Sequence, residues 1–180
     1  MSAPLRDELI SHLPAMRAFA ISLTRSRAAA DDAVQDAVLK ALTNFDKFEP
    51  GTNMRAWLFT ILRNTYYSSK RKYHRETSDP DGILTDSIAV KPDHDGRLQY
   101  DDFRKAFDTL SDDQREVLIL VGASGFSYEE AAEMTGVAIG TVKSRVNRAR
   151  ARLAELLALK EGPIELTDKA TIAVVSRNLG

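Results

Sequence analysis

Apolar residues recur at intervals of three or four along most of the chain, which is the spacing of amphipathic helices. From Leu9 to Leu42 this pattern is interrupted only by a short polar stretch at residues 24–30, which predicts two antiparallel helices. In the second of these helices, Val34, Val38 and Leu42 are predicted to face the core.

The second helix, expected over residues 28–42, has two acids near its start, Asp31 and Asp32. Acids in a first turn complement the positive end of the helix dipole. Asp32 also shares a polar face with Gln35 and Asp36, and this face could instead dock on a basic surface of a partner. The spacing alone favours the structural interpretation.

A loop is predicted at residues 45–53, because Pro50 and Gly51 interrupt the helical pattern. The chain becomes helical again near residue 54, and six side chains should share the core side of this helix: Met54, Trp57, Leu58, Ile61, Leu62 and Thr65. Trp57, the only tryptophan, is therefore interpreted as a packing residue rather than as one that stacks on bases.

The opposite side of the same helix carries aromatic and basic residues that are predicted to face solvent. They are Phe59, Arg63, Tyr67 and Lys70, with Tyr66 beside them. Because rings stack on unpaired bases and cations contact phosphates, this surface favours single-stranded nucleic acid. A protein partner or a small second core would bury the same side chains and stays an alternative.

Charge is segregated along the chain, although the formal net charge is only -1. Residues 63–75 contain five Lys or Arg and no acid, whereas residues 76–102 contain eight acids against Lys91 and Arg97. With Pro and Gly among the acids, residues 77–99 are interpreted as an acidic flexible linker between two domains. A solvated spacer is favoured over a nucleic-acid mimic that occupies a basic channel on a partner.

Two more helices are predicted after this linker, at residues 100–110 and 112–122. The side chains available for their core are Leu110, Val117, Leu118, Leu120 and Val121. With the two helices that follow, they predict a four-helix domain, so that the fold class is all-α with two small helical domains.

Residues 127–153 have the layout of a helix-turn-helix. Ser127 and Glu130 have the spacing of a capping box, which marks the start of a helix. Two alanines at 131 and 132 allow close helix packing, and Gly136 tolerates the positive φ of a sharp turn.

The second helix of this motif should have one apolar and one basic side. Its apolar positions are Val142, Val146, Ala149 and Leu153. Its other side carries Lys143, Ser144, Asn147 and Arg148. Lys and Arg can contact phosphates, and Asn, Ser and Arg can bond base edges in a major groove. Charge alone allows a merely solvated basic face, but the capping box and glycine turn before it favour DNA recognition.

Composition disfavours several classes of protein. The 180 residues, 43% of them apolar, suffice for one or two modest helical cores, and the absence of cysteine excludes disulfides and thiolate metal sites. No apolar run reaches the roughly 20 residues of a membrane helix, so we expect a cytoplasmic protein with no membrane partner. The histidines, His12, His74 and His94, are scattered and no catalytic motif is present, so we expect no enzyme activity, metal or cofactor.

Over residues 9–157 the chain resembles the small two-domain extracytoplasmic-function sigma factors of bacterial RNA polymerase. The resemblance is carried by MRAWLFTILRNTYYSSKRK from residue 54 and by LSDDQREVLILVGASGFSYEEAAEMTGVAIGTVKSRVNRARARL from residue 110. Within that family the chain looks most like the general-stress-response type of alphaproteobacteria.

The resemblance implies a promoter-specificity subunit that binds core polymerase, recognises the −35 and −10 promoter elements and directs transcription initiation of stress-response genes. It implies a region 2 domain at residues 1–76, the linker at 77–99, and a region 4 domain at 100–160. The role of a tail at 161–180 is not implied by the family. An anti-sigma protein is the implied regulatory partner, and RNA synthesis would belong to the polymerase.

The resemblance also implies roles for individual residues. For the −35 duplex these are Lys143, Ser144, Arg145, Asn147 and Arg148, with Arg145 on phosphate. The loop at residues 46–53 would capture a flipped base of the −10 element. Residues implied near that element are Asn53, Arg55, Phe59, Arg63, Tyr67 and Lys70. Asp32, Gln35 and Asp36 would dock on the clamp helices of the largest polymerase subunit, and the linker would thread toward the RNA exit region.

The alternative function is a free-standing helix-turn-helix regulator that binds duplex operators without polymerase. Such proteins commonly pair two recognition helices on half-sites about one helical turn apart. The sequence contains no coiled-coil heptad that would build such a dimer, which disfavours this alternative.

Overall fold

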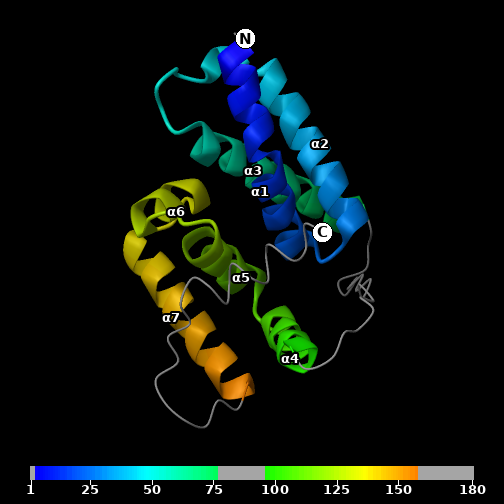
Figure 1. Cartoon of the computed structure of the whole chain (residues 1–180), viewed down its shortest axis with the longest axis vertical. Coiled ribbons are helices and arrows are strands. Elements are labelled where there is room, and N and C mark those ends of the chain that lie inside the picture. Colours follow the sequence, from blue (N-terminus) through cyan, green and yellow to red (C-terminus); the bar gives the residue numbers. More distant parts are fainter. Residues whose placement is uncertain (1–2, 77–95, 158–180) are drawn as a thin grey trace. The chain divides into compact units, whose positions relative to one another are not determined.

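The computed structural model describes residues 3–76 and 96–157, which form helices without any strand in these two stretches. The chain divides into two compact units, residues 1–88 and 89–180, and each is described by itself (Figure 1). The predicted all-α class with two helical domains is confirmed. Residues 77–95 of the linker predicted at 77–99 and the predicted tail at 161–180 lie outside the described residues.

Over its described residues, 3–76, the first unit forms three long helices and one short turn of helix. These are α1 (Ala3–Thr24), α2 (Arg27–Thr43), the 3-10 helix η1 (Phe45–Lys47) and α3 (Met54–Glu76). Each of the three long helices packs against the other two. Fully buried side chains at their centre include Met16, Phe19, Leu58, Phe59 and Leu62.

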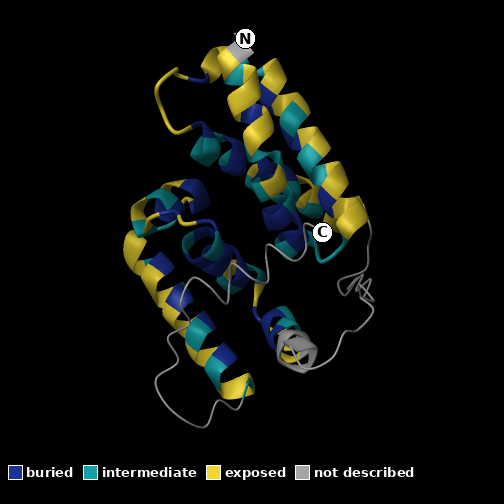
Figure 2. Ribbon diagram, in the orientation of Figure 1, coloured by how far each residue is buried: buried dark blue, intermediate teal, exposed yellow. Residues whose placement is uncertain are grey.

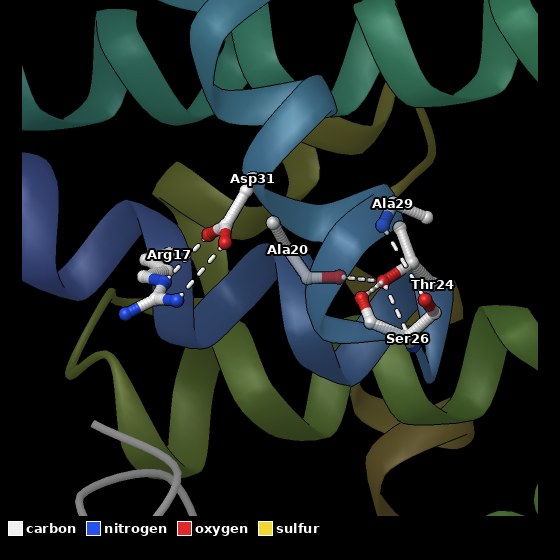
Figure 3. A network of polar contacts seen from close by, with 6 residues as sticks. All are labelled: Arg17, Ala20, Thr24, Ser26, Ala29 and Asp31. Atoms are coloured by element: carbon white, nitrogen blue, oxygen red, sulfur yellow. Dashed lines mark hydrogen bonds and ion pairs between the residues drawn. The ribbon is translucent and has the colours of Figure 1, made fainter. Parts of the chain in front are cut away.

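The corner between α1 and α2 is held by polar contacts (Figure 3). Arg25 takes a positive φ of 59°, and Ser26 caps α2 by accepting a hydrogen bond from the amide of Ala29 at 3.3 Å. Because α2 begins at residue 27, the first-turn role predicted for the two acids is wrong. Asp31 instead forms a two-pronged ion pair with Arg17 of α1, with N–O distances of 2.6 and 3.0 Å.

The core face of α2 differs from the predicted one. The buried residues are Ala30, Ala37 and Ala41, whereas Val34 and Val38 are half-buried and Leu42 is 45% exposed. Small side chains face the core because α2 lies against both α1 and α3, which leaves little room between the helix backbones. The larger apolar side chains are displaced to the rim, and the assignment of Val34, Val38 and Leu42 to the core is wrong.

Residues 96–157 of the second unit form four α-helices and one π-helical turn. They are α4 (Gly96–Asp108), α5 (Asp112–Leu118), η2 (Ile119–Ala123), α6 (Tyr128–Thr135) and α7 (Ile139–Leu156). Helix α4 begins four residues before its predicted start, so residues 96–99 belong to it and not to the predicted linker. Of the predicted core side chains, Leu110, Val117, Leu118 and Leu120 are buried and Val121 is half-buried.

A π-helical turn directly continues α5, where the sequence pattern predicted an ordinary helix. The amide of Ser124 donates to the carbonyl of Ile119 at 2.8 Å, five residues back, and the amide of Phe126 donates to Leu120 at 3.0 Å. The wider turn accommodates an extra residue before α6 begins. Capping boxes start both neighbouring helices, at Ser111 with Gln114 and at Ser127 with Glu130.

Candidate nucleic-acid interface

Helices α6 and α7 form the predicted helix-turn-helix. The side chain of Ser127 accepts from the amide of Glu130 at 3.0 Å, and Glu130 accepts from the amide of Ser127 at 2.8 Å, which confirms the capping box. Gly136 ends α6 with a φ of 69°, a conformation that costs a side-chain-bearing residue energy. The glycine turn therefore sets the angle at which α7 leaves α6.

The two sides of α7 are divided as predicted (Figure 2). Its buried residues are Val142, Val146, Ala149 and Leu153. The exposed residues among those predicted to meet DNA are Lys143, Ser144, Asn147 and Arg148. The apolar side fixes the helix on α5 and α6, so the polar side is presented to solvent along a rigid axis.

The two exposed cations of α7 that are predicted to meet DNA both have partners within the protein. The guanidinium of Arg148 donates to the hydroxyl of Ser144 at 2.9 Å and to the Ser144 carbonyl at 3.3 Å. The ammonium of Lys143 lies 5.8 Å from the centroid of the Tyr128 ring, at the start of α6. Both cations therefore lie near the surface of the motif rather than extending freely from it.

Arg145 is less exposed than the other four residues predicted to meet the −35 duplex, and it is held by an acid of α5. Its guanidinium lies 2.5 Å from a carboxylate oxygen of Asp113, and the two side chains are 21% and 53% exposed. The predicted phosphate contact of Arg145 stays a prediction, but the ion pair gives this guanidinium a competing partner.

The structure corrects the predicted solvent-facing surface of α3 at Phe59. This ring is fully buried and stacks on Phe19 of α1, with ring centroids 5.1 Å apart, while the guanidinium of Arg55 lies 5.5 Å from the ring centroid. A ring with no exposed surface cannot stack on a base. The prediction that Phe59 faces solvent is wrong, because α3 contacts two helices and its buried arc is wider than one stripe.

The remaining members of that surface are more accessible. Arg63 lies over the ring of Tyr67, 4.8 Å from its centroid, and both side chains are half-buried, as is Lys70. Tyr66 stacks edge-on against Tyr67 at 5.0 Å and donates its hydroxyl proton to the carbonyl of Leu23 at 3.0 Å. Tyr66 therefore ties α3 to the end of α1, which leaves Arg63, Tyr67 and Lys70 as candidates for nucleic-acid contact.

The other flank of α3 borders a pocket of about 320 Å³ that the sequence analysis missed. It lies between α2, η1 and α3 and is lined by Lys40, Asn44, Lys47, Trp57, Ile61, Asn64, Thr65 and Ser68. The ammonium of Lys40 donates to the Thr65 hydroxyl at 3.2 Å, and that of Lys47 donates to the Asn44 amide oxygen at 2.8 Å. The pocket thus combines two cations, amide groups and one side of an indole.

An aromatic cluster supports Trp57, which lines this pocket. Trp57 packs against Phe48 and Phe45, with ring centroids 5.2 and 6.1 Å away, so its predicted packing role is confirmed although the side chain is only half-buried. Asn53 begins α3 by accepting a hydrogen bond from the amide of Ala56 at 3.1 Å. The loop before α3 therefore ends in a cap that fixes its position beside the pocket.

One signal for the pocket was present in the sequence. Trp57, Ile61, Asn64 and Ser68 are spaced by four, three and four residues and share one helical flank. The two lysines come from the preceding helix and turn, and only the fold brings them to this flank.

The predicted docking face of α2 is exposed along its length. Asp32, Gln35 and Asp36 are all exposed, and the same helix exposes Leu39 by 57% and Leu42 by 45%. Acidic and apolar groups therefore occur together on the outer side of α2.

One histidine of the first unit has a shifted pKa. The pKa of His12 on α1 is lowered, mainly by burial and then by the charge of Arg55, against a smaller opposing effect of Glu8.

In residues 3–76 and 96–157 no group of three or more His, Asp or Glu side chains could hold a metal ion. Within the same stretches, no helix has the length and apolar character needed to cross a membrane.

Comparison with known families identifies both units. The model of sigma-70 region 2 matches residues 9–76, and the model of sigma-70 region 4 matches residues 100–153. The ECF RNA polymerase sigma factor EcfG of Rhodopseudomonas palustris is 54% identical over 153 residues, which cover 85% of this chain and 84% of that protein.

Solved structures give the same result. The sigma factor RpoE in its complex with the anti-sigma factor NepR from Bartonella quintana is 54% identical, with a TM-score of 0.78 over 89% of this chain and 100% of that one. CnrH in complex with the cytosolic domain of CnrY is 28% identical, with a TM-score of 0.61 over 86% and 88% of the two chains. A free-standing helix-turn-helix regulator is not favoured by these matches. The chain belongs to the extracytoplasmic-function sigma factors, the promoter-recognition subunits of bacterial RNA polymerase.

Proposed function

We propose that this sigma factor reads the −35 element as duplex with the exposed side of α7 and captures an unpaired base of the −10 element in the pocket beside α3. The pocket is the observation that carries the second half of this proposal. The region 2 domain would comprise residues 1–76, and the region 4 domain would comprise residues 100–160 together with the first residues of α4 at 96–99, joined through 77–95.

The exposed side of α7 has the chemistry of a major-groove helix. Arg148 can bond guanine O6 and N7, and Asn147 can bond adenine N6 and N7. Lys143 lies beside Tyr128 and is suited to a phosphate at the edge of the groove. Arg145 would have to exchange its Asp113 partner for a phosphate before it could add to this contact.

The pocket beside α3 has the features of a site for one flipped base. Its volume of about 320 Å³ lies at the lower end of small-molecule sites, which span roughly 300–1,000 Å³. Trp57 packs on Phe45 and Phe48 but is only half-buried, so the accessible part of its indole can also contact a base. The amide group of Asn64 can bond a base edge, and Lys40 and Lys47 can meet the adjoining phosphate. The predicted base-capturing loop at residues 46–53 joins this pocket to α3.

The opposite flank of α3 is suited to the backbone of the melted strand. Arg63, Tyr67 and Lys70 supply two cations and a ring, and Arg55 and Asn53 lie at the loop end of the same helix. Phe59 would act only from within the core, by holding α3 against α1.

Core polymerase would dock on the outer side of α2. Asp32, Gln35 and Asp36 can pair with a basic surface such as the clamp helices of the largest subunit, and Leu39 and Leu42 would be buried in that contact. Acidic residues alone would give a weak contact in water, so the exposed leucines strengthen the assignment of this face.

Regulation and location follow from this assignment. An anti-sigma protein would hold the factor inactive, as the complexes of RpoE with NepR and of CnrH with CnrY suggest. The chain would act in the cytoplasm, where the polymerase works, and would supply promoter recognition with no catalytic step of its own. Its target genes would be those of a general stress response, in line with its similarity to EcfG.

The test uses core polymerase, the full chain and promoter DNA whose −10 element is unpaired and carries 2-aminopurine at one position at a time. We expect a fluorescence rise at one position, because capture of a base removes it from its neighbours. Asn64→Ala should abolish that rise, whereas the adjacent control Arg63→Ala should weaken binding to all sequences and reduce its salt dependence.

The opposite pattern would contradict the pocket assignment, with Arg63→Ala selective for one base and Asn64→Ala without effect. Specific transcripts that appear only when the chain is added to core polymerase are expected in parallel. Binding of the chain to a duplex operator without polymerase, and no transcripts with it, would refute the sigma-factor mechanism.

A further inference from the structure

Ser144 is one of the exposed side chains of α7, and the resemblance to sigma factors places it among those that read the −35 element. In the structure it lies against Arg148, one helical turn further on. The hydroxyl of Ser144 accepts from Nη2 of Arg148 at 2.9 Å, and the carbonyl of the same serine accepts from Nε at 3.3 Å. One residue thus contacts one edge of the guanidinium with two acceptors.

The shape of the guanidinium decides what remains for DNA. It is planar and carries five N–H donors in a fixed fork. Nε and Nη2 form one edge of this plane, and Ser144 occupies that edge. The second edge, formed by Nη1 and Nη2, lies at the outer end of the plane and has the geometry that matches guanine O6 and N7.

A restrained arginine has an advantage over a mobile one. A free arginine side chain carries about 2 kcal/mol of rotamer entropy that is lost when it is fixed on a base. Part of that loss is avoided if the side chain is already held in the bound direction before contact. Both residues are exposed, so this restraint comes from Ser144 and not from burial.

We propose that Ser144 is a positioning residue that orients Arg148 for guanine in the −35 element, and that it does not itself read a base. This inference rests on the proposed role of α7 in −35 recognition. It also distinguishes Ser144 from Asn147, which is exposed on the same side and is assigned a base contact.

The experiment measures binding of holoenzyme, formed from core polymerase and the full chain, to promoter fragments. Each guanine of the −35 element is replaced in turn by 7-deazaguanine, which lacks the N7 acceptor. With the wild-type chain, one such replacement should weaken binding about tenfold, the loss expected for one arm of a bidentate contact. With Ser144→Ala, overall binding should weaken about three- to tenfold, and the same replacement should cost much less.

Three further variants complete the test. Ser144→Thr retains the hydroxyl and should restore the sensitivity to 7-deazaguanine. Arg148→Ala should remove this sensitivity, and the double variant should bind no worse than Arg148→Ala alone. Alanine is a better helix former than serine, so loss of binding by Ser144→Ala cannot be attributed to a weakened helix.

Three results would overturn the inference. If Ser144→Ala still weakens binding in the Arg148→Ala background, and does so at a different base pair, Ser144 reads DNA directly. If Ser144→Ala weakens binding to promoter and scrambled duplexes equally, Ser144 supports DNA binding in general and not recognition of guanine through Arg148. If instead Arg148→Ala and every guanine replacement leave −35 binding unchanged, the proposed role of α7 fails together with the inference.

Discussion

The ion pair between Arg145 and Asp113 leads to a prediction in which stability and DNA affinity change in opposite directions. Replacing Asp113 by Asn keeps the size of the side chain and removes its charge. The 2.5 Å pair joins α7 to α5, with the arginine 21% and the aspartate 53% exposed. Exposed pairs contribute about 0.2–1 kcal/mol, and partial burial of the arginine places this pair near 1 kcal/mol.

This magnitude sets the size of both effects. Asp113→Asn should lower the free energy of unfolding of the second unit by up to about 1 kcal/mol. The same 1 kcal/mol no longer opposes transfer of Arg145 to a phosphate, so affinity for a −35 duplex should rise by up to about fivefold. In this background, a further Arg145→Ala change should reduce the slope of log affinity against log salt by about 0.9, the value for one phosphate contact.

Urea denaturation followed by circular dichroism measures the first effect, and salt titration of holoenzyme on a −35 duplex measures the second. Asp112→Asn is a control for the salt titration only, because Asp112 pairs with the buried Arg115 on the same helix and not with α7, and loss of that partner lowers stability by itself. The reasoning fails if Asp113→Asn weakens DNA binding as much as Arg145→Ala does and leaves the salt slope unchanged. Arg145 would then serve only to hold α7 in place.

Three more predictions concern the contribution of single residues to the stability of the folded chain. Phe59→Ala should destabilise the first unit by about 3–5 kcal/mol in urea denaturation, because it removes a fully buried ring stacked on Phe19, and a stability loss below 1 kcal/mol would contradict its core position. Because the pKa of His12 is lowered in the folded chain, the unfolded chain binds a proton at this histidine at a higher pH, so the free energy of unfolding should fall as the pH drops below about 6.5. His12→Gln should flatten that fall between pH 7.5 and 5.5. An unchanged profile would exclude His12 as the cause of the fall. Ser127→Ala should lower the free energy of unfolding of the second unit by about 1 kcal/mol through loss of the cap, and the shift in melting temperature measures this loss. Ser144→Ala is the control, because Ser144 lies inside α7 and caps no helix.

Sequence periodicity succeeded where charged side chains mark the outer face of a helix. On α7, every residue predicted to be buried is buried, because Lys143, Asn147 and Arg148 leave only one apolar side. On α2 the same reasoning failed, because alanine and valine are both apolar and periodicity cannot rank them. Ala37 is buried and Val38 half-buried since the space between three packed helices admits only the smaller side chain.

The candidate site shows a second limit of sequence reasoning. The exposed residues of α7 lie on one helix, so spacing alone could group them. The pocket beside α3 draws Lys40 from α2 and Lys47 from η1, and these residues join Asn64 only through tertiary packing. Phe59 was misplaced for a related reason, since a helix that contacts two neighbours buries more of its circumference than one amphipathic stripe.

The π-helical turn at residues 119–123 constrains how the length of this segment can change during evolution. Deletion of one residue there would restore ordinary α-helical hydrogen bonding. Because each residue of an α-helix turns the chain by about 100°, the deletion would also rotate the residues that follow by that angle around the axis of α5. Helix α7 would then turn its polar side away from the direction in which it now points. Insertions and deletions of single residues should therefore be rare in this segment among functional relatives, even where substitutions are common.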